Sequence, residues 1–573
     1  MRRVIQQYGL ALAVLACFVF GSVQAADKGS RHHARGEYDT VTATYVVLEG
    51  DDLFAVSERF EIPVEDLKAQ NQLSSNEIKP GQKLVVGTAS AGGSPPAKPY
   101  KMTTPIPASI PMPDRLDTRF GTLNFFDGVP DQASTEKLYD NLDFQRAVQA
   151  YLLGLPAVSQ WANRKGFVEW GPANSTVPIF ETLMNARTLE LTANNNTPYT
   201  WIWLDLRNGP LVLEVPPKVL GAIDDMWYHW VSDVGITGPD KGQGGKYLLL
   251  PPGYKGEVPD GYHVVHCTTF SVWIPWRSFL VDGDPKPGVG LVKKFTKLYP
   301  LSQAGNPPTP TFVNVSNKAF NTIAPADYSF WEALNQVVQE EPTDPIDPTT
   351  LGFWASVGIQ KGKSFAPDAR MKKILTEAAR VGDATARAIM YRWRTPDGYW
   401  YPNSAWRLGF IGGYQFEDNG ARLLDAYSGF FFYATGVTPA MDTKAVGVGS
   451  QYMAAFVDSK GHPFDGGKNY RLHLPPNIPV KDFWSVILYD SQTRSMLQTD
   501  QDWPAVSSQT QGLLVNADGS VDVYFGPTAP AGKENNWIQT LPGKSWNTLL
   551  RLYGPLEPWF NKTWRPGEIE PLP

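Results

Sequence analysis

Cysteine and basic clusters are both scarce in this sequence. Only two of the 573 residues are cysteine, Cys17 and Cys267, and no dense run of Lys or Arg accompanies the formal net charge of −6. The first scarcity limits the chain to one disulfide, and the second argues against nucleic acid as a partner. After residue 25, no apolar run approaches the ~18 residues of a membrane helix, so we expect no transmembrane segment.

The first 25 residues have the features of an export signal. The sequence MRR precedes an apolar run at residues 10–20, and VQA at 23–25 offers a small-residue cleavage site. Cleavage after Ala25 removes Cys17, leaves Cys267 without a partner and changes the net charge to −8. Lipidation at Cys17 is the alternative, but the apolar run continues past it. We therefore expect an exported protein of the periplasm or cell envelope.

Familiar catalytic signatures are also missing. The sequence has no HExxH, no GxSxG, no P-loop and no GxGxxG after a strand. The nearest metal candidates are His263 and Cys267, but His266 between them points to the other face of a strand, so we expect no metal site. Catalytic residues and cofactors therefore stay unassigned. Spacing selects no pair among the carboxylates considered for acid–base chemistry, which are Asp205, Glu214, Asp425, Asp490 and Glu557.

Glycine, proline and aromatic residues are abundant. The chain has 51 Gly, 49 Pro and 19 Trp, and its Gly and Pro together exceed the usual share of about 12%. They lie between short β-rich runs, a pattern typical of many strands joined by turns. The length predicts two to four domains. From about residue 117 onward, helical spacing marks residues 133–153 and 328–390.

Residues 45–86 have the pattern of a small separate module. Strands are expected at 45–48 and 83–86, with two helices between them. Asp51 or Asp52 is the expected N-cap of the first helix, and Phe54 is expected to point inward.

Three stretches of this segment, GDDLFAVSERF, NQL and IKPGQKLVV, resemble a LysM module. The resemblance implies a βααβ fold that binds N-acetylglucosamine-containing glycans, such as peptidoglycan, in a shallow groove. A LysM fold that no longer binds sugar is the alternative. The resemblance carries the groove over to Gly50, Asp51, Leu53, Leu73 and Ile78.

The remainder resembles two further families. NNNTPYTWIWLDLRNGPLVLEVPP and GGKYLLLPPGYKGEVPDGYHVV look like the domain of unknown function numbered 1254, and GVGSQYMAAFVDSKGHPFDGGKNYRLHLPP and NWIQTLPGKSWNTLLRLYGPLEPW look like the one numbered 1214. The resemblance implies two β-sandwich, jelly-roll-like domains with accompanying helices, and supplies no chemistry. One departure is Asn196, where the first family often has Asp.

The expected organisation is therefore multidomain. An internal echo, GGKYLLLPP at 244–252 and GGKNYRLHLPP at 466–476, indicates either two related sandwiches or convergent turn chemistry. The expected segments are a signal peptide (1–25), a LysM module (41–87), a Pro/Ser/Gly-rich linker (88–117), a first β-rich domain (118–300), a connecting, partly helical region (301–440) and a second β-rich domain (441–573).

The stretch YTWIWLDL at 199–206 raises the question of a binding site. In a strand, Tyr199, Trp201, Trp203 and Asp205 share one face. That face is either an aromatic platform for a ligand or the inside of a packed layer, and we favour packing because buried aromatics are commoner. If a pocket exists, Asn195 and Asn196 add amides that can bond hydroxyl groups, so all six residues form the candidate pocket.

Several cations lie near expected turns. They are able to hold a carboxylate or sulfate, but we favour ion pairs that pin turns and chain ends. These residues are Lys246, Lys468, Arg494, Arg551, Lys562 and Arg565.

The sequence leads to three functional hypotheses. The first is a cell-envelope protein tethered to peptidoglycan by LysM, with paired β-domains that bind a carbohydrate or a protein partner. The second is a wall-tethered enzyme of unrecognised type, a hydrolase or metal-assisted oxidase. The third is an architectural homo-oligomer.

Overall fold

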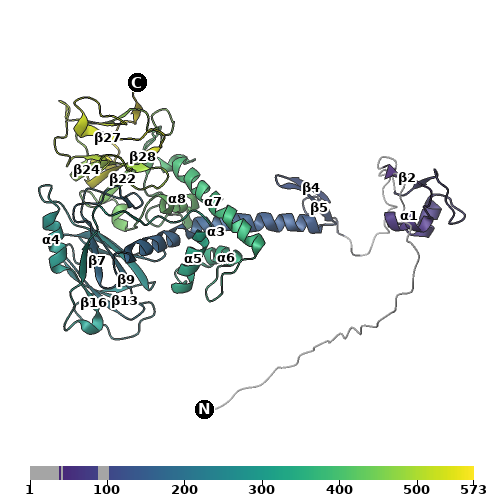
Figure 1. The fold of residues 1–573 in the computed structure, drawn as a ribbon, viewed down its shortest axis with the longest axis horizontal. Helices are drawn as coiled ribbons and strands as arrows, with labels where there is room; N and C mark the ends of the chain where they lie inside the picture. Colours follow the sequence, from purple (N-terminus) through teal and green to yellow (C-terminus); the bar gives the residue numbers. More distant parts are fainter. Residues whose placement is uncertain (1–37, 40–42, 88–101, 103) are drawn as a thin grey trace, which may run out of the picture. The chain divides into compact units, whose positions relative to one another are not determined.

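The structure is a computed structural model that describes residues 38–39, 43–87, 102 and 104–573. The expected export signal, Cys17 and half of the linker lie outside the described residues. The chain divides into two compact units, Met1–Pro111 and Met112–Pro573 (Figure 1). No helix in the described part combines the length and the apolar character that crossing a membrane requires.

The small unit has the expected βααβ order. Strand β2 pairs antiparallel with β3, and a short β1 adds an edge. The core contains Tyr45, Leu53 and Leu84, which are fully buried. The elements of this unit are β1 (Tyr38–Asp39), β2 (Thr44–Val46), α1 (Leu53–Phe60), α2 (Val64–Gln70) and β3 (Lys83–Val85).

The first helix of this unit settles two expectations. Asp52 is its N-cap, because the Asp52 carboxylate accepts a hydrogen bond of 2.7 Å from the Ala55 N–H. The expectation that Phe54 points inward is wrong, since its side chain is 61% exposed. The helix begins at Leu53, so Leu53 and Val56, three positions apart, occupy the buried face and Phe54 lies on the outer one.

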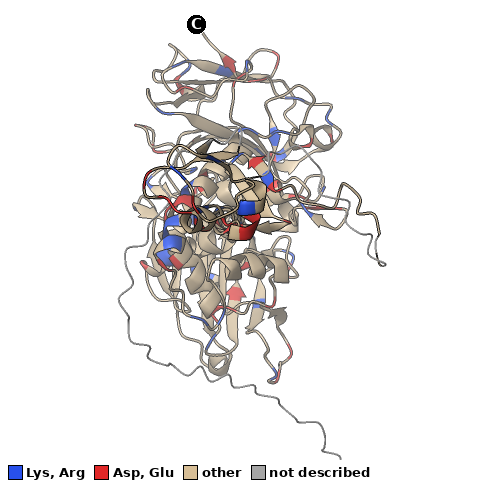
Figure 2. Cartoon of the chain, turned by 90° about the vertical axis from the view of Figure 1, so that its right-hand side faces the viewer, with Lys and Arg blue, Asp and Glu red and all other residues tan. Residues whose placement is uncertain are grey.

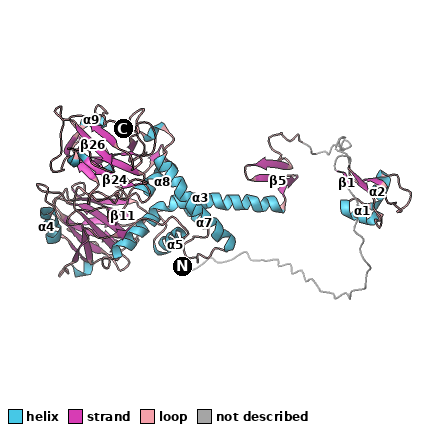
Figure 3. Cartoon of the chain, turned by 45° about the horizontal axis from the view of Figure 1, so that its top comes forward, coloured by secondary structure: helices cyan, strands magenta, loops and turns pink. Residues whose placement is uncertain are grey.

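The large unit contains two β-sandwiches, each built from a large and a small sheet (Figure 3). The strands of the first sandwich are β7 (Thr176–Ile179), β9 (Tyr199–Asp205), β10 (Leu211–Val215), β11 (Leu220–Asp225), β12 (Trp230–Gly235), β13 (Gly245–Leu250), β14 (His263–His266), β15 (Ser271–Arg277), β16 (Lys297–Pro300) and β17 (Thr311–Asn314). Those of the second are β19 (Arg407–Leu408), β22 (Ser450–Ala455), β23 (Tyr470–Leu474), β24 (Val480–Asp490), β25 (Ala505–Ser507), β26 (Val521–Gly526), β27 (Trp537–Gln539), β28 (Trp546–Pro555) and β29 (Glu570–Pro571).

The two sandwiches have the same topology. The large sheets run β12-β11-β15-β9-β7-β17 and β25-β24-β28-β22-β19, and the small sheets run β14-β13-β10-β16 and β27-β26-β23-β29. Taken in chain order, β9 to β16 therefore correspond one by one to β22 to β29. The directions agree as well, because β13 with β14 and β26 with β27 are parallel and the other equivalent pairs are antiparallel. The chain thus contains one sandwich design twice.

The sequence echo does not mark this duplication. The echo aligns strand β13 with strand β23. In the topology, however, β13 is equivalent to β26, and β23 is equivalent to β10. The similarity of the two sequence segments therefore comes from glycine turns before the strands and prolines that end them, in strands that are not equivalent. Each small sheet also contains one parallel pair, so the finer jelly-roll description, which is antiparallel, is not confirmed.

A long helix, α3 (Gln132–Val168), and four others pack beside the sandwiches (Figure 1). The sequence predicted a helix only to residue 153, but α3 continues through Pro156 because residues 150–160 are buried on every side. Packing there outweighs the lost hydrogen bond of a helical proline. The other helices beside α3 are α5 (Ser329–Glu340), α6 (Pro348–Ser356), α7 (Ala369–Tyr391) and α8 (Leu424–Tyr433).

Figure 2 shows Lys and Arg interspersed with Asp and Glu along the chain.

The remaining elements are peripheral. The peripheral elements are β4 (Arg115–Thr118), β5 (Gly121–Phe126), β6 (Val129–Pro130), β8 (Thr188–Leu189), α4 (Lys286–Phe295), β18 (Phe320–Asn321), β20 (Glu417–Asp418), β21 (Ala421–Arg422) and α9 (Glu557–Phe560).

The large unit has three main cores. One fills the first sandwich, one fills the second, and a central core lies between the two large sheets and the helices. Strand β9 contributes to two of them: Ile202 and Leu204 enter the first sandwich, whereas Trp201 and Trp203 face the central core. There Phe167 of α3 lies 5.0 Å from Trp201, centroid to centroid. The aromatic face of this strand is thus the inside of a packed layer.

Candidate functional site

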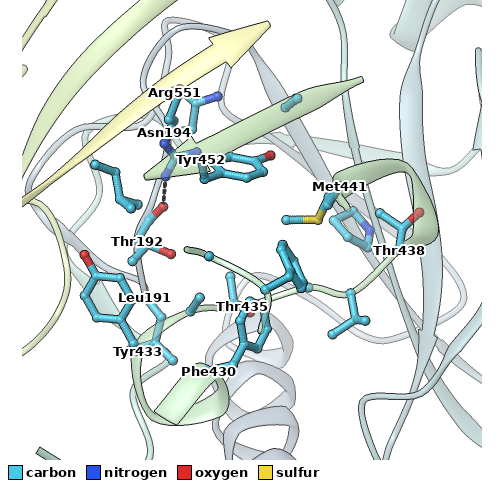
Figure 4. Close-up of a pocket in the computed structure, with 18 of the residues that line it drawn as sticks. Leu191, Thr192, Asn194, Phe430, Tyr433, Thr435, Thr438, Met441, Tyr452 and Arg551 are labelled. Atoms are coloured by element: carbon cyan, nitrogen blue, oxygen red, sulfur yellow. Dashed lines mark hydrogen bonds between the residues drawn. The ribbon is translucent and has the colours of Figure 1, made fainter. Parts of the chain in front are cut away.

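A cavity of about 160 Å³ lies within the central core, between the two sandwiches. Strands β9, β11 and β15 line it from the first sandwich, and β22 and β28 from the second. Helix α8 and the segments 190–194 and 434–438 complete its wall (Figure 4). Most lining side chains are apolar, among them Leu191, Phe430 and Met441.

The first sandwich contributes an arginine–tyrosine pair to this cavity. Arg277 on β15 lies directly opposite Tyr199 on β9. The guanidinium carbon is 5.6 Å from the Tyr199 ring centroid and 5.5 Å from that of Tyr553 on β28. Its side chain is also hydrogen-bonded to Tyr452 of the second sandwich.

The second sandwich contributes the same pair on the equivalent strands. Arg551 on β28 lies opposite Tyr452 on β22, with its guanidinium carbon 5.5 Å from the ring centroid. Arg551 also donates a hydrogen bond to the carbonyl of Thr192 (Figure 4). It donates a second one, over 2.8 Å, to the hydroxyl of Tyr489. The duplication therefore places two equivalent guanidinium groups around a shared set of tyrosines.

These two cations have no acidic partner among the described residues. Neither Arg277 nor Arg551 forms an ion pair within 4.0 Å there, and Arg551 is buried whereas Arg277 is half-buried. Nη1 of Arg277 and Nε of Arg551 also lack a hydrogen-bond partner in the described part of the chain. Arg407, a third lining arginine, stacks on Trp393 and donates to a backbone carbonyl. Burying unpaired charge is costly unless an anion completes the site.

Two carboxyl groups line the cavity without neutralising it. Burial raises the pKa of Glu190 to about 8, although hydrogen bonds from Thr322 and Thr435 favour its ionised form. Burial also raises the pKa of Asp224 well above its usual range, despite a 3.0 Å hydrogen bond from the Val437 N–H. Burial thus favours the neutral form of both groups, and the cavity, lined by three arginines, keeps a net positive charge.

The segment 434–438 forms one wall and is held by polar contacts to the first sandwich. Thr435 hydrogen-bonds to Tyr228, and the Thr438 hydroxyl donates to the Asp233 carboxylate over 2.6 Å. Gly436 between them has a φ of +79°, and a Cβ there would lie 3.8 Å from Trp273. The wall is thus tied to the strands that carry the first arginine–tyrosine pair.

The six residues of the sequence-based candidate pocket line three different hollows. Tyr199 and Trp201 line the central cavity. Trp203 and Asp205 line a cleft of about 410 Å³ beside α3, where Asp205 is paired with Arg207. The structure places Asn195 and Asn196 on an open groove between the sandwiches.

The candidate glycan-binding residues of the LysM module all belong to the chain's small unit. Asp51 accepts hydrogen bonds from the Tyr45 hydroxyl, at 2.5 Å, and the Leu48 N–H, at 2.8 Å. Leu53 is fully buried, so only its backbone can face a ligand. Leu73 and Ile78 are half-buried against the core, and Gly50 has a φ of +92°.

The two metal candidates, His263 and Cys267, both lie toward the core of the first sandwich. Cys267 is buried in the core of the first sandwich, and the His263 ring lies 5.0 Å from the Tyr247 ring. No group of three or more His, Cys, Asp or Glu side chains is arranged for a metal ion in the described segments.

The carboxylates considered for acid–base chemistry are each engaged in an ion pair with a different cation. Two of the cations that the sequence placed near turns can be compared with the structure. Arg551 lies in a strand rather than at a turn, and Arg565 forms an ion pair with Glu568 at 3.1 Å. The carboxylate pairs are Asp205–Arg207, Glu214–Lys297, Asp425–Arg394, Asp490–Lys544 and Glu557–Lys444.

Sequence reasoning missed Arg277, Glu190, Asp224 and Tyr452. Nothing in their spacing brings them together, because the site depends on two sandwiches facing each other. One signal was present: Arg277 ends the apolar run SVWIPWR, where a charge inside a strand without a nearby acid is unusual.

Comparison with protein families gives three matches in order along the chain. Residues 45–87 match the LysM domain, 175–300 match DUF1254 and 449–557 match DUF1214, the last two described as proteins of unknown function. The predicted family order is thus confirmed. Through residues 45–87 the chain belongs to the LysM family, which implies binding of N-acetylglucosamine-containing glycan such as peptidoglycan.

Individual relatives add context. The "Uncharacterized protein YkzQ" of Bacillus subtilis is 40% identical over 61 residues, which are 11% of this chain and 81% of that protein. The crystal structure of the VPA0106 protein from Vibrio parahaemolyticus is similar with a TM-score of 0.48 and 19% identity, covering 75% of this chain and all of that one. A putative uncharacterized protein from Burkholderia cenocepacia has a TM-score of 0.34 and 13% identity, covering 77% and 97%.

Proposed function

We propose that this protein is an exported cell-envelope protein that its LysM module holds on peptidoglycan, and that its large unit binds a small organic anion in the central cavity. The observation that carries the second part is the pair of guanidinium groups from buried Arg551 and half-buried Arg277, which have no acidic partner in the described chain. Two like charges around one cavity repel each other until an anion lies between them.

The shape and lining of the cavity define the ligand further. A cavity of about 150 Å³ accommodates a benzene-sized molecule, and this one measures about 160 Å³ with mostly apolar walls. The lining favours an apolar body with one carboxylate, sulfonate or phosphate group over the carbohydrate expected from the sequence. The anionic group binds between Arg277 and Arg551, and the body lies against Leu191 and Phe430.

The test is isothermal titration of the full chain with benzoate as probe and benzyl alcohol as its uncharged counterpart. We expect benzoate to bind with one site per chain and benzyl alcohol to bind at least tenfold more weakly, a difference of about 1.4 kcal/mol. Arg277→Met should weaken benzoate binding at least as much.

The matched control is Arg380→Met, which removes an exposed arginine of α7 outside the cavity lining. It should leave benzoate binding unchanged. Equal affinity of wild type and Arg277→Met for benzoate, or of wild type for benzoate and benzyl alcohol, would contradict the proposal.

A further inference from the structure

A second hollow lies on the other side of the loop that follows Ala193. Asn194 lines the central cavity, whereas the next two residues, Asn195 and Asn196, line an open groove of about 950 Å³. The groove runs between the β15–α4 connection of the first sandwich and the residues around β25 of the second. Its volume is within the range of about 300–1,000 Å³ that is usual for ligand sites.

The groove offers hydrogen-bond acceptors that have no partner. Asn195 and Asn196 are 5% and 7% exposed, and the carboxamide oxygen of each lacks a hydrogen-bond partner among the described residues. A buried amide oxygen without a donor costs about 1–3 kcal/mol. A ligand that supplies O–H or N–H donors removes that cost, whereas a carboxylate or phosphate ligand offers acceptors only.

The rest of the lining mixes polar and apolar residues and has no net charge, because Glu181 and Asp284 balance Lys286 and Lys293. Gln509, Thr510 and Gln511 supply amides and a hydroxyl from the second sandwich. Glu181 and Lys293 cancel each other in an ion pair of 2.7 Å. Trp503 at the same groove is 44% exposed, although large aromatic side chains are usually covered. Hydroxyl- and amide-bonding groups around one exposed indole are suited to sugar rings.

We propose that this groove binds an oligosaccharide of N-acetylhexosamine units, the class of glycan that the LysM module implies. Sugar hydroxyl and acetamido N–H groups donate to Asn195 and Asn196, and the apolar face of one ring stacks on Trp503. The large unit then contacts the wall glycan directly, at a site separate from the LysM groove. This proposal does not depend on the ligand of the central cavity.

The full chain permits a test that the LysM module does not obscure, because all 19 tryptophans follow residue 111. Chain labelled with 5-fluorotryptophan is titrated with chitotetraose and with muramidase-released peptidoglycan fragments, and observed by fluorine NMR. The Trp503 resonance, identified by its loss in Trp503→Phe, should shift with both glycans. The resonance of Trp230, which is 36% exposed and outside the groove, should not.

Two variants and two further ligands sharpen the result. Asn196→Ala should weaken the chitotetraose effect about tenfold, which corresponds to about 1.4 kcal/mol, whereas Asn314→Ala, an exposed position at the groove margin, should change it less than threefold. Cellotetraose, which lacks acetamido groups, should shift Trp503 much less. No shift of Trp503 at millimolar chitotetraose, an equal response to cellotetraose, or a response only to free stem peptide would overturn the proposal.

Discussion

At the scale of the residue, Arg277 is the clearest test of function against structure. It is half-buried with its Nη1 atom shielded from solvent, and its described neighbours are tyrosines rather than acids. Replacing a residue that stabilises the fold should lower the free energy of unfolding. Replacing a cation whose anionic partner is a ligand should not, because the cation has no partner in the unliganded protein. We expect Arg277→Met to lower the free energy of unfolding by less than about 1 kcal/mol, measured by urea unfolding followed through tryptophan fluorescence. A loss of several kcal/mol would indicate a structural role.

The two arginines should also act together on one anion. If both bind the same carboxylate, the effects of Arg277→Met and Arg551→Met on benzoate affinity are not additive. We expect the double variant to bind little worse than either single variant, with a coupling energy of about 1 kcal/mol or more. Titration of the four proteins with benzoate measures this. Additive losses would place the two side chains on separate groups.

Glu190 should make the stability of the large unit depend on pH. The folded chain keeps the Glu190 proton up to about pH 8, whereas an ordinary Glu loses it near pH 4.5. Its contribution is therefore complete below pH 4.5 and is lost as the pH rises to about 8. Relative to Glu190→Gln, wild type should lose roughly 3 kcal/mol between pH 5 and pH 8. Parallel pH profiles of urea unfolding for the two proteins would contradict this assignment.

At the scale of the element, helices α3 and α7 pack too closely for any side chain at Gly382. A Cβ there would lie 2.4 Å from the Tyr151 ring of α3. Alanine is the better helix former by about 1 kcal/mol, but the clash should dominate. We expect Gly382→Ala to lower the free energy of unfolding by about 1–3 kcal/mol. The control is Gly352→Ala in α6, where nothing lies within 4 Å, and which should raise it.

The LysM module depends on one asparagine that joins its second helix to its last strand. The Asn71 amide donates to the Val85 carbonyl at 2.8 Å and accepts from the Val85 N–H at 2.6 Å. Asn71→Ala should destabilise the module by about 2 kcal/mol and reduce co-sedimentation with peptidoglycan. Tryptophan fluorescence, which reports the large unit, should show an unchanged unfolding transition. A shared loss of stability would show that the two units unfold together.

At the scale of the whole molecule, local patterns in the sequence predicted the elements better than their assembly. The βααβ module, both β-rich regions and the helical zone between them follow from short-range spacing and turns. The duplication could not be predicted in this way, because corresponding strands such as β15 and β28 share their place in the topology rather than a similar amino-acid sequence. The cavity could not be predicted either: Arg277 and Arg551 are 274 positions apart and meet only when the two large sheets face each other.

The duplication explains why the cavity contains two equivalent arginine–tyrosine pairs. One sandwich supplies Arg277 and Tyr199, the other supplies Arg551 and Tyr452 on equivalent strands, and each arginine interacts with tyrosine on both sides. Neither sandwich alone encloses the cavity. The large unit therefore acts as a single binding body, and separating its halves should abolish benzoate binding even if each half folds.

The most direct measurement is a crystal of the full chain soaked with 4-bromobenzoate, whose bromine is located by anomalous scattering. The account predicts a bromine peak against the apolar wall of the central cavity, with the carboxylate between the guanidinium groups of Arg277 and Arg551. The same soak of Arg277→Met should lack the peak. A bound bromobenzoate elsewhere with the cavity empty, or a carboxylate turned away from both arginines, would contradict the central claim.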